Sequence, residues 1–358
     1  MHPGIATILE AVKQHGPHTE AYKELGSIKA SLHPNGQLLI FNYTDLATFE
    51  ARWNEVEVVS RGLIIRWPTA SLAALPFQKF FNLNENALTQ INTLPAGPCE
   101  VTVKLDGSLG ILYRPDGGYA ISTRGNFISN QAIWATEYLN EHYDLTGLAA
   151  DITLLFEIVY PENKIIVHYG ETEALYLIGA RRFDGYDYPY AELQTLGAQF
   201  GFPVVPSVQV ASFKDLLPLV ESSQGIEGWV VRFSNGLRVK VKTTEYIRIT
   251  KILMGLTPKK MRDWLLAGGP DALTRAMQGL PEEIYQDMRK IGDDIIGRAE
   301  AEESRLRSLY EQLAPLALQS RRDFALTVRD QHLADSSYLF ALIDHKPLWP
   351  LILKNIEL

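Results

Sequence analysis

The strongest constraint on the fold of this chain is a change in its hydrophobic pattern near Tyr246. Before this point, short apolar and β-branched runs alternate with turn formers, and after it the apolar residues recur at helical spacing. Pro115-Asp116-Gly117-Gly118 and Ser234-Asn235-Gly236 are typical of hairpin turns, which require antiparallel pairing. The pattern predicts an α+β fold: an antiparallel-sheet domain over residues 1–250, followed by an all-helical domain over residues 251–358.

The individual elements follow from the same periodicities. The expected strands are 37–43, 57–67, 99–104, 109–113, 119–123, 153–159, 164–169, 174–183, 228–233 and 237–242. The expected helices are 131–143, 191–200, 213–221, 261–266, 271–277, 281–313 and 320–329. Helix breaks are predicted at Gly268-Gly269-Pro270 and at Pro315.

Composition excludes several classes of protein. The 358 residues carry a formal net charge of −8, which argues against coating of nucleic acid by bulk charge. Basic residues nevertheless gather between Arg232 and Arg262, where Glu245 is the one acidic residue, so a local polyanion site is expected. A single cysteine, Cys99, excludes an internal disulfide framework and a multi-cysteine zinc site. With no apolar run of membrane length and no secretory signal, we expect a cytoplasmic protein that does not enter membranes.

A lysine motif marks the end of one predicted strand. Lys104-Leu105-Asp106-Gly107 ends the strand 99–104 beside a tight turn. A lysine amine becomes nucleophilic when burial and neighbouring cations disfavour its ammonium form, and a glycine lets the backbone approach a ligand closely. Alone, the motif is weak and favours an ordinary strand-turn-strand with an exposed lysine.

Four further motifs in the same predicted domain change this interpretation. They are Ser122-Thr123-Arg124-Gly125, Phe156-Glu157, Glu227-Gly228 and Lys240-Val241-Lys242. Amines and guanidinium groups neutralise phosphates, whereas carboxylates hold a divalent metal or ribose hydroxyls. Together the motifs predict a site for a nucleoside triphosphate and a divalent metal.

The order of these motifs resembles the covalent nucleotidyltransferase superfamily of RNA ligases, DNA ligases and mRNA capping enzymes. Within it, the chain is similar to the T-even phage single-strand RNA ligase family over roughly residues 35–275. The narrower likeness lies in Phe41-Asn42-Tyr43, Ser60-Arg61-Gly62-Leu63, the segment Lys79 to Asn86, and the stretch from Phe156 through Tyr169. The resemblance implies an ATP-grasp-like ligase domain at the N-terminal side.

The resemblance also implies roles for individual residues. Lys104, in its turn with Asp106 and Gly107, would attack the α-phosphate of ATP and hold AMP as a lysyl phosphoramidate. The implied ATP contacts are Phe41, Arg61, Lys79, Glu157 (to the ribose), Lys240 and Lys242. Glu227 and Asp271 are the implied ligands of Mg²⁺ or Mn²⁺, Arg124 would place the nucleotide or RNA end, and Tyr246 matches a residue needed for activity. Phe41 and Arg124 depart from the tyrosine and lysine of the phage enzyme.

The implied function is ATP-dependent joining of 5′-phosphate and 3′-hydroxyl RNA ends in RNA repair. The implied partners are RNA ends, including nicked tRNA, and an end-healing kinase/phosphatase, with a monomeric ligase. The C-terminal helices, which do not match the phage tRNA-recognising domain, are expected to select the RNA. A DNA ligase, an mRNA guanylyltransferase and a non-catalytic RNA-binding relative stay open as alternatives.

Overall fold

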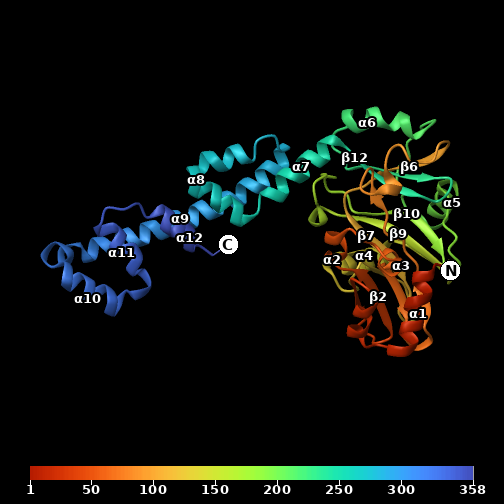
Figure 1. Cartoon of the computed structure of the whole chain (residues 1–358), viewed down its shortest axis with the longest axis horizontal. Coiled ribbons are helices and arrows are strands. Elements are labelled where there is room, and N and C mark those ends of the chain that lie inside the picture. The colour runs from red at the N-terminus through yellow and green to blue at the C-terminus, as the bar shows by residue number, and fades with distance from the viewer. Residues whose placement is uncertain (358) are drawn as a thin grey trace. The chain divides into compact units, whose positions relative to one another are not determined.

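The computed structural model describes residues 1–357, apart from the side chain of Glu283. The chain divides into two compact units, the first spanning Met1–Tyr246 and the second beginning at Ile247 (Figure 1). Among the described residues, no helix combines the length and apolar character needed to cross a membrane.

The first unit begins with a four-stranded antiparallel sheet, the N-terminal sheet, in the order β1-β2-β3-β4. Its strands are β1 (Ile28–Leu32), β2 (Leu38–Tyr43), β3 (Arg61–Arg66) and β4 (Ser71–Ala74). Strand alternation gives β2 two apolar faces. Leu39 and Phe41 pack with helix α1 (Pro3–His15), whereas Leu38 and Ile40 face a second cluster that contains Ile111. The sheet is therefore covered on both sides.

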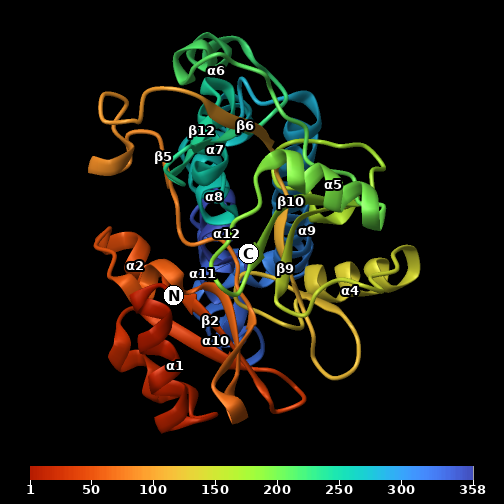
Figure 2. The ribbon, with the colours of Figure 1, turned by 90° about the vertical axis from the view of Figure 1, so that its right-hand side faces the viewer.

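Two further four-stranded sheets complete the first unit (Figure 2). The Glu157 sheet has the order β10-β9-β7-β8 and consists of β7 (Ser108–Tyr113), β8 (Ala120–Ser122), β9 (Ile152–Val159) and β10 (Ala174–Arg182). The Lys104 sheet has the order β5-β12-β11-β6 and consists of β5 (Phe81–Asn82), β6 (Cys99–Lys104), β11 (Gly228–Phe233) and β12 (Arg238–Lys242). All pairings are antiparallel except β5 with β12.

Short helices surround these sheets. They are α2 (Asp45–Glu50), α3 (Glu55–Val59), α4 (Asn130–His142), α5 (Tyr190–Phe200) and α6 (Leu217–Ser222), with 3-10 turns η1 (Thr19–Leu25), η2 (Trp67–Thr69), η3 (Ala87–Thr89), η4 (Pro161–Asn163) and η5 (Phe213–Leu216). Helices α4 and α5 pack on the core of the Glu157 sheet, where Leu139 and Leu193 join Phe156.

The described part of the second unit is helical. Helix α7 (Thr244–Gly255) spans the boundary between the units, and it is followed by α8 (Pro258–Ala276), α9 (Glu282–Gln319), α10 (Arg321–Gln331), η6 (Leu333–Asp335), α11 (Ser336–Ile343) and α12 (Trp349–Asn355). Met261, Leu273, Ile295 and Leu348 share one core of this unit. The predicted break at Gly268-Gly269 is confirmed, because both residues leave helical geometry inside α8.

Three sequence expectations about elements are wrong. Residues 57–59 belong to α3 rather than to a strand, because Asn54 and Glu57 cap that helix reciprocally. Residues 164–169 form no strand, since the N–H groups of Ile166 and Val167 donate to the Asp106 carboxylate instead. Helix α9 continues through Pro315. A proline removes one backbone hydrogen bond, and the flanking Leu313 and Leu316 still pack against α10 and α11.

Candidate functional site

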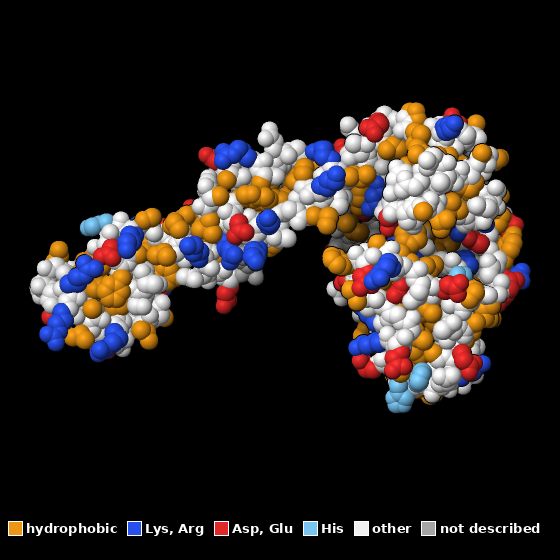
Figure 3. All heavy atoms as spheres, in the orientation of Figure 1, with side chains coloured by type: hydrophobic (Ala, Val, Ile, Leu, Met, Phe, Trp, Pro, Cys, Tyr) orange, Lys and Arg blue, Asp and Glu red, His pale blue; other side chains and the backbone are white. Residues whose placement is uncertain are grey.

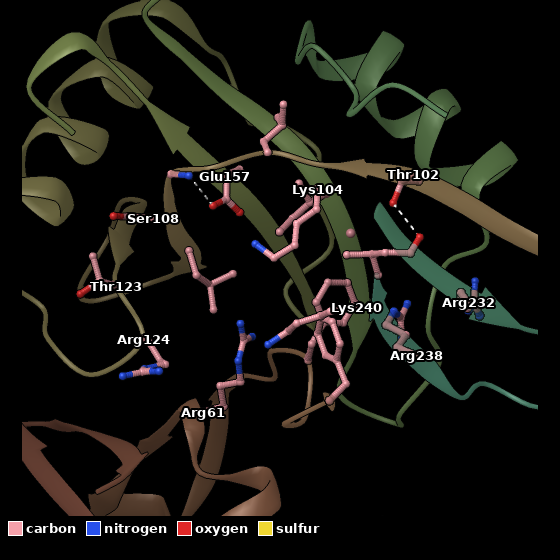
Figure 4. Close-up of a pocket in the computed structure, with 18 of the residues that line it drawn as sticks. Arg61, Thr102, Lys104, Ser108, Thr123, Arg124, Glu157, Arg232, Arg238 and Lys240 are labelled. Atoms are coloured by element: carbon pink, nitrogen blue, oxygen red, sulfur yellow. Dashed lines mark hydrogen bonds between the residues drawn. The ribbon is translucent and has the colours of Figure 1, made fainter. Parts of the chain in front are cut away.

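The three sheets of the first unit surround a cavity of about 530 Å³ (Figure 4). Its wall carries many more cations than anions. The basic lining residues are Lys29, Arg61, Lys104, Arg124, Arg232, Arg238 and Lys240, and the acidic ones are Glu100 and Glu157. Like charges held this close repel one another, so the cavity suits a ligand with several negative charges.

The register of the Lys104 sheet brings two lysines and one carboxylate together. Gly228 of β11 pairs with Lys104 of β6 on one side and with Lys242 of β12 on the other. Glu227 precedes Gly228, and its carboxylate lies between both ammonium groups, with Nζ–O distances of 2.7 Å to Lys104 and 3.0 Å to Lys242. A Cβ at Gly228 would lie 2.0 Å from the Val241 carbonyl oxygen, so the close approach of these strands requires glycine.

Asp106 anchors the turn that follows Lys104. This residue is buried, and its carboxylate accepts hydrogen bonds of 2.8 Å from the backbone N–H groups of Ile166 and Val167 and from the Tyr246 hydroxyl. The Tyr169 hydroxyl accepts a hydrogen bond from the Asp106 N–H. Burial raises the pKa of Tyr246 and raises that of Tyr169 to about 12, so both phenols keep their protons at neutral pH.

Gly107 connects the same turn to Glu157. Its N–H donates to Glu157 Oε1 at 3.0 Å, and a Cβ at this position would lie 2.4 Å from the Ile158 carbonyl oxygen. Burial raises the pKa of Glu157 to about 7, although the Lys104 ammonium opposes that shift. Glu157 is thus a carboxyl group with a raised pKa in the same cavity as the nucleophile candidate, as is common at functional sites.

Arg61 and Lys240 share the centre of the cavity wall with the Phe80 ring. The ring lies 5.5 Å from the Arg61 guanidinium carbon and 4.9 Å from Lys240 Nζ. Burial lowers the pKa of Arg61, and it lowers that of Lys240 to about 6, with further contributions from the charges of Arg61, Lys79 and Lys104. Arg61 Nη1 is buried and has no hydrogen-bond partner among the described residues. Buried polar groups are normally hydrogen-bonded, so this nitrogen is a candidate donor to a bound anion.

Two glycines permit close contact of the turn at residues 123–126, which carries Arg124, with β2 and β3. A Cβ at Gly62 would collide with Ile111 and approach the Arg124 carbonyl oxygen to 3.3 Å, and a Cβ at Gly125 would lie 2.9 Å from the Asn42 amide nitrogen. Arg124 Nη1 donates to the Tyr43 hydroxyl at 2.9 Å. The arginine is therefore held at the wall by an aromatic residue of β2.

Lys79 lies beside the cavity and does not line it. Its ammonium is 4.1 Å from the centre of the Phe81 ring, 5.0 Å from that of Trp53, and 3.6 Å from Glu85. Burial lowers its pKa, and the Arg61 and Arg124 charges add to that effect. Lys79 is therefore close enough to two of the cavity cations to interact with them electrostatically.

Several predicted site residues of the first unit do not line the cavity: besides Lys79, these are Phe41, Asp106, Glu227, Lys242 and Tyr246. Phe41 is fully buried against Tyr22, with ring centres 5.0 Å apart, because strand alternation turns it toward α1. The predicted ATP contact of the Phe41 side chain therefore does not agree with this structure, in which its neighbour Asn42 lines the wall. Asp271 lies exposed in α8 of the second unit, and its role as a metal ligand stays a prediction.

The structure adds cavity residues that sequence reasoning missed. Arg232 and Arg238 belong to the basic run already evident in the sequence, and strand alternation places Arg238 on the same face as Lys240. Arg238 pairs with Asp187, and Arg232 Nη1 donates to Glu100 at 3.1 Å. Asn42 lies in the Phe41-Asn42-Tyr43 segment, in which the sequence pointed to Phe41 instead, and no motif signalled Lys29, its partner in the pairing of β1 with β2.

The donor set limits how a divalent metal could be held. Among the described residues, no group of three or more His, Cys, Asp or Glu side chains could enclose a metal ion. Glu157 and Glu227 remain as oxygen donors near Lys104. Magnesium commonly binds through one or two carboxylates together with substrate phosphates and waters, so this pair fits a metal that arrives with a phosphate ligand.

The chain is similar in sequence and fold to known proteins. A family model described as RNA ligase, of the T4 RNA ligase 1 type, matches residues 59–246. An RNA ligase of Rhodothermus phage RM378 is 26% identical, with 86% of this chain and 85% of that protein covered. A candidate RNA ligase of Thermovibrio ammonificans is 28% identical over 52% of each chain, so this chain spans about half the length of that relative. A solved archaeal ATP-dependent RNA ligase is similar in fold, with a TM-score of 0.50, 13% identity and coverage of 82% and 78%.

The structure places the strand-end Lys104 at a cation-lined cavity between antiparallel sheets, and the family model assigns the class of the protein as RNA ligase. The family match spans both the Lys104 turn and the Lys240–Lys242 arm. The chain belongs to the T4 RNA ligase 1-type RNA ligase family.

Proposed function

We propose that this protein is an ATP-dependent RNA ligase that joins 5′-phosphate and 3′-hydroxyl ends through a lysyl-AMP intermediate. The observation that carries the proposal is the placement of Lys104 in the cation-lined cavity, 2.7 Å from Glu227. Membership of the RNA ligase family supports the same reaction.

In the first step, the Lys104 amine attacks the α-phosphorus of ATP, the P–N bond forms, and pyrophosphate departs. Glu227 accepts a hydrogen bond from Lys104 Nζ and is suited to receive the proton that the ammonium must lose before attack. Arg61, Lys240 and Lys242 supply positive charge where the triphosphate oxygens accumulate negative charge. Such electrostatic stabilisation and positioning account for most of the catalysis in phosphoryl transfer.

In the later steps, the RNA 5′-phosphate attacks the AMP phosphorus, the P–N bond breaks, and the Lys104 nitrogen leaves as the amine. The 3′-hydroxyl then attacks the activated 5′-phosphate, and AMP departs. Glu157, held by the Gly107 N–H, is the proposed ribose contact, and Glu227 together with Asp271 the proposed metal ligands. A bound Mg²⁺ or Mn²⁺ supplies Lewis-acid stabilisation of phosphate charge.

We further propose that the helical unit selects the RNA. On the face shown in Figure 3, Lys and Arg side chains are spread over the helices of this unit. Lys259 and Lys260, in the first turn of α8, are exposed and join no ion pair among the described residues. Charge reversal at both positions should weaken sealing of RNA in a salt-dependent way and leave lysyl-AMP formation unchanged. Nicked tRNA as the substrate and an end-healing kinase/phosphatase as the partner belong to the same proposal.

Intact mass after incubation with ATP and Mg²⁺ tests the ligase proposal directly. The wild type should gain one AMP with ATP and none with GTP, and Lys104→Ala should gain nothing. An adduct with GTP would favour a capping guanylyltransferase. The absence of any adduct, from protein freed of bound AMP, would favour a non-catalytic RNA-binding protein. Ligation assays with RNA and DNA ends then separate an RNA ligase from a DNA ligase.

A further inference from the structure

The cavity has one end at which its lining is exposed to solvent. Among the described lining residues, Lys29, Arg124 and Asn126 are exposed, and the others are buried or half-buried. The three lie around one residue, because Asn42 pairs with Lys29 across β1 and β2 and is in contact with Gly125, the residue between Arg124 and Asn126. The cavity therefore opens here, and we call Lys29, Arg124 and Asn126 the cavity mouth.

The cavity mouth carries two cations and no acidic residue. Among the described residues, the Lys29 ammonium joins no ion pair and no hydrogen bond, and the partner of Arg124 is the uncharged Tyr43 hydroxyl. The acidic lining residues, Glu100 and Glu157, belong to β6 and β9 instead. Because its positive charge is not compensated, the mouth attracts anions, and because that charge is exposed, the attraction weakens with salt.

Lys29 lies outside the row of cations at the centre of the cavity. Its partner in β2 is Asn42, whose partner in β3 is Arg61, so the three residues form a row across the N-terminal sheet. Neighbouring strands lie about 4.8 Å apart, which places the backbone of Lys29 about 10 Å from that of Arg61. Arg61 shares the Phe80 ring with Lys240, whereas Lys29 stands on the edge strand β1. Lys29 therefore serves an anion farther out than the one at Arg61.

The direction of the Lys104 side chain indicates which anion passes the mouth. Its amine points toward the side of the cavity on which Arg61 and Arg124 lie (Figure 4). In the proposed function, on which this inference rests, the RNA 5′-phosphate attacks opposite the departing lysine and therefore from that side. Pyrophosphate ends at its second phosphate, whereas an RNA strand continues outward from its 5′-phosphate. The strand thus carries further phosphates out through the mouth, where the exposed ammonium of Lys29 lies.

We propose that Lys29 binds an internucleotide phosphate near the 5′ end of the RNA strand and so guides the reacting 5′-phosphate through the cavity mouth. Lys29 then acts on the backbone of the strand, while Arg61 and Lys240 act on the reacting phosphates. A contact with backbone phosphate positions a strand without reading its sequence. No ion pair or hydrogen bond of the described residues depends on the Lys29 side chain, so its replacement leaves the scaffold intact.

The test measures single-turnover AMP transfer from the full-length protein, charged with AMP beforehand, to subsaturating 5′-phosphorylated oligoribonucleotides. The strands carry an uncharged methylphosphonate at the first, second or third linkage, or none. Lys29→Ala should slow transfer to the unmodified strand by roughly 3- to 10-fold at low salt, and the slope of log rate against log salt should become shallower by about 0.7. At one linkage the methylphosphonate should slow the wild type, and Lys29→Ala should then add no further loss, because both changes remove one contact. Lys29→Arg, which keeps the charge, should retain most of the rate. Lys214→Ala, an exposed substitution on η5 outside the cavity lining, should change no rate.

Several outcomes would overturn the role of Lys29. A loss in Lys29→Ala that is equally large with all four strands would show that none of these internucleotide phosphates is its partner. An unchanged rate and salt slope on the unmodified strand would contradict the contact altogether. Inability of Lys29→Ala to become charged with AMP would place Lys29 on the triphosphate instead. A wild type that forms no lysyl-AMP would contradict the proposed function itself, whereas the other outcomes leave that function standing and reject this inference alone.

Discussion

Replacement of Tyr246 by phenylalanine tests how much one buried hydroxyl contributes to holding the turn after Lys104. Tyr246 is 6% exposed and donates to Asp106 Oδ1 at 2.8 Å. The phenylalanine ring preserves the contact with Lys242, whose Nζ lies 4.8 Å from the ring centre. Asp106 keeps its two backbone donors. The substitution therefore removes one hydroxyl group from an otherwise intact environment.

The expected loss of stability in Tyr246→Phe follows from the acceptor of the lost hydrogen bond, the Asp106 carboxylate. A hydrogen bond to a carboxylate contributes about 1.5–3 kcal/mol, and the unfolding free energy of the first unit should fall by that amount. If the lost interaction positions Lys104 in the transition state, lysyl-AMP formation should slow by about 10- to 150-fold, at about 1.4 kcal/mol per factor of ten. Tyr246 would then be a positioning residue that acts through Asp106.

Tyr186→Phe provides a matched control. The Tyr186 hydroxyl also donates to a carboxylate, that of Glu192, at 2.8 Å, but the side chain is 43% exposed. Its loss should change stability by less than about 1 kcal/mol and leave lysyl-AMP formation unchanged. Chemical denaturation and single-turnover adenylylation measure the two quantities. Tyr246→Phe with wild-type stability and rate would refute the inference that this hydroxyl holds the turn.

Three further predictions concern the same cavity. Because burial lowers the pKa of Lys240 to about 6 and a bound triphosphate favours the ammonium, nucleotide binding at pH 7.5 should take up about one proton and tighten as the pH falls from 9 toward 6. Calorimetry in buffers of different ionisation enthalpy measures the uptake, which Lys240→Met should abolish. In Gly228→Ala the added Cβ would lie 2.0 Å from a carbonyl oxygen, so thermal unfolding should show the first unit destabilised by more than about 3 kcal/mol. Gly236→Ala is the control, because its Cβ meets no atom within 4 Å and the only cost is the strain of a positive φ. Glu227→Gln leaves Lys104 and Lys242 without their shared carboxylate, so it should cost about 3–5 kcal/mol of stability and abolish the lysyl-AMP mass adduct. A normal adduct would contradict the proposed role of Glu227 in lysyl-AMP formation.

Much of the site was predictable because strand periodicity fixes which residues share a face. The strand 99–104 agrees with the structure at both ends, and the hairpin that ends in Lys240 and Lys242 lies beside it as β11 and β12. The motif order predicted that Lys104, Glu157 and Glu227 belong to one site, and the structure places all three around one turn.

The rest depends on contacts between segments far apart in the chain. Nothing local shows that Phe41 turns toward α1 while Asn42 faces the cavity, since both follow from the packing of the N-terminal helix. The apolar segment 164–169 has strand character, yet the Asp106 carboxylate about 60 residues earlier takes its backbone donors. Residues 57–59 became helical through a capping box that a strand pattern conceals.

The pairing of Gly228 with both Lys104 and Lys242 restricts where insertions and deletions can occur in the Lys104 sheet. A one-residue slip of β11 against either neighbour would turn Glu227 to the opposite face and separate it from both lysines. The turn after Phe233 lies at the far end of the hairpin, where Gly236 closes it by a hydrogen bond to the Phe233 carbonyl. Length changes within the family should therefore accumulate in this turn in forms that restore the pairing, such as two residues at a time. The strands themselves should keep a constant length between Glu227 and Phe233 and between Arg238 and Lys242.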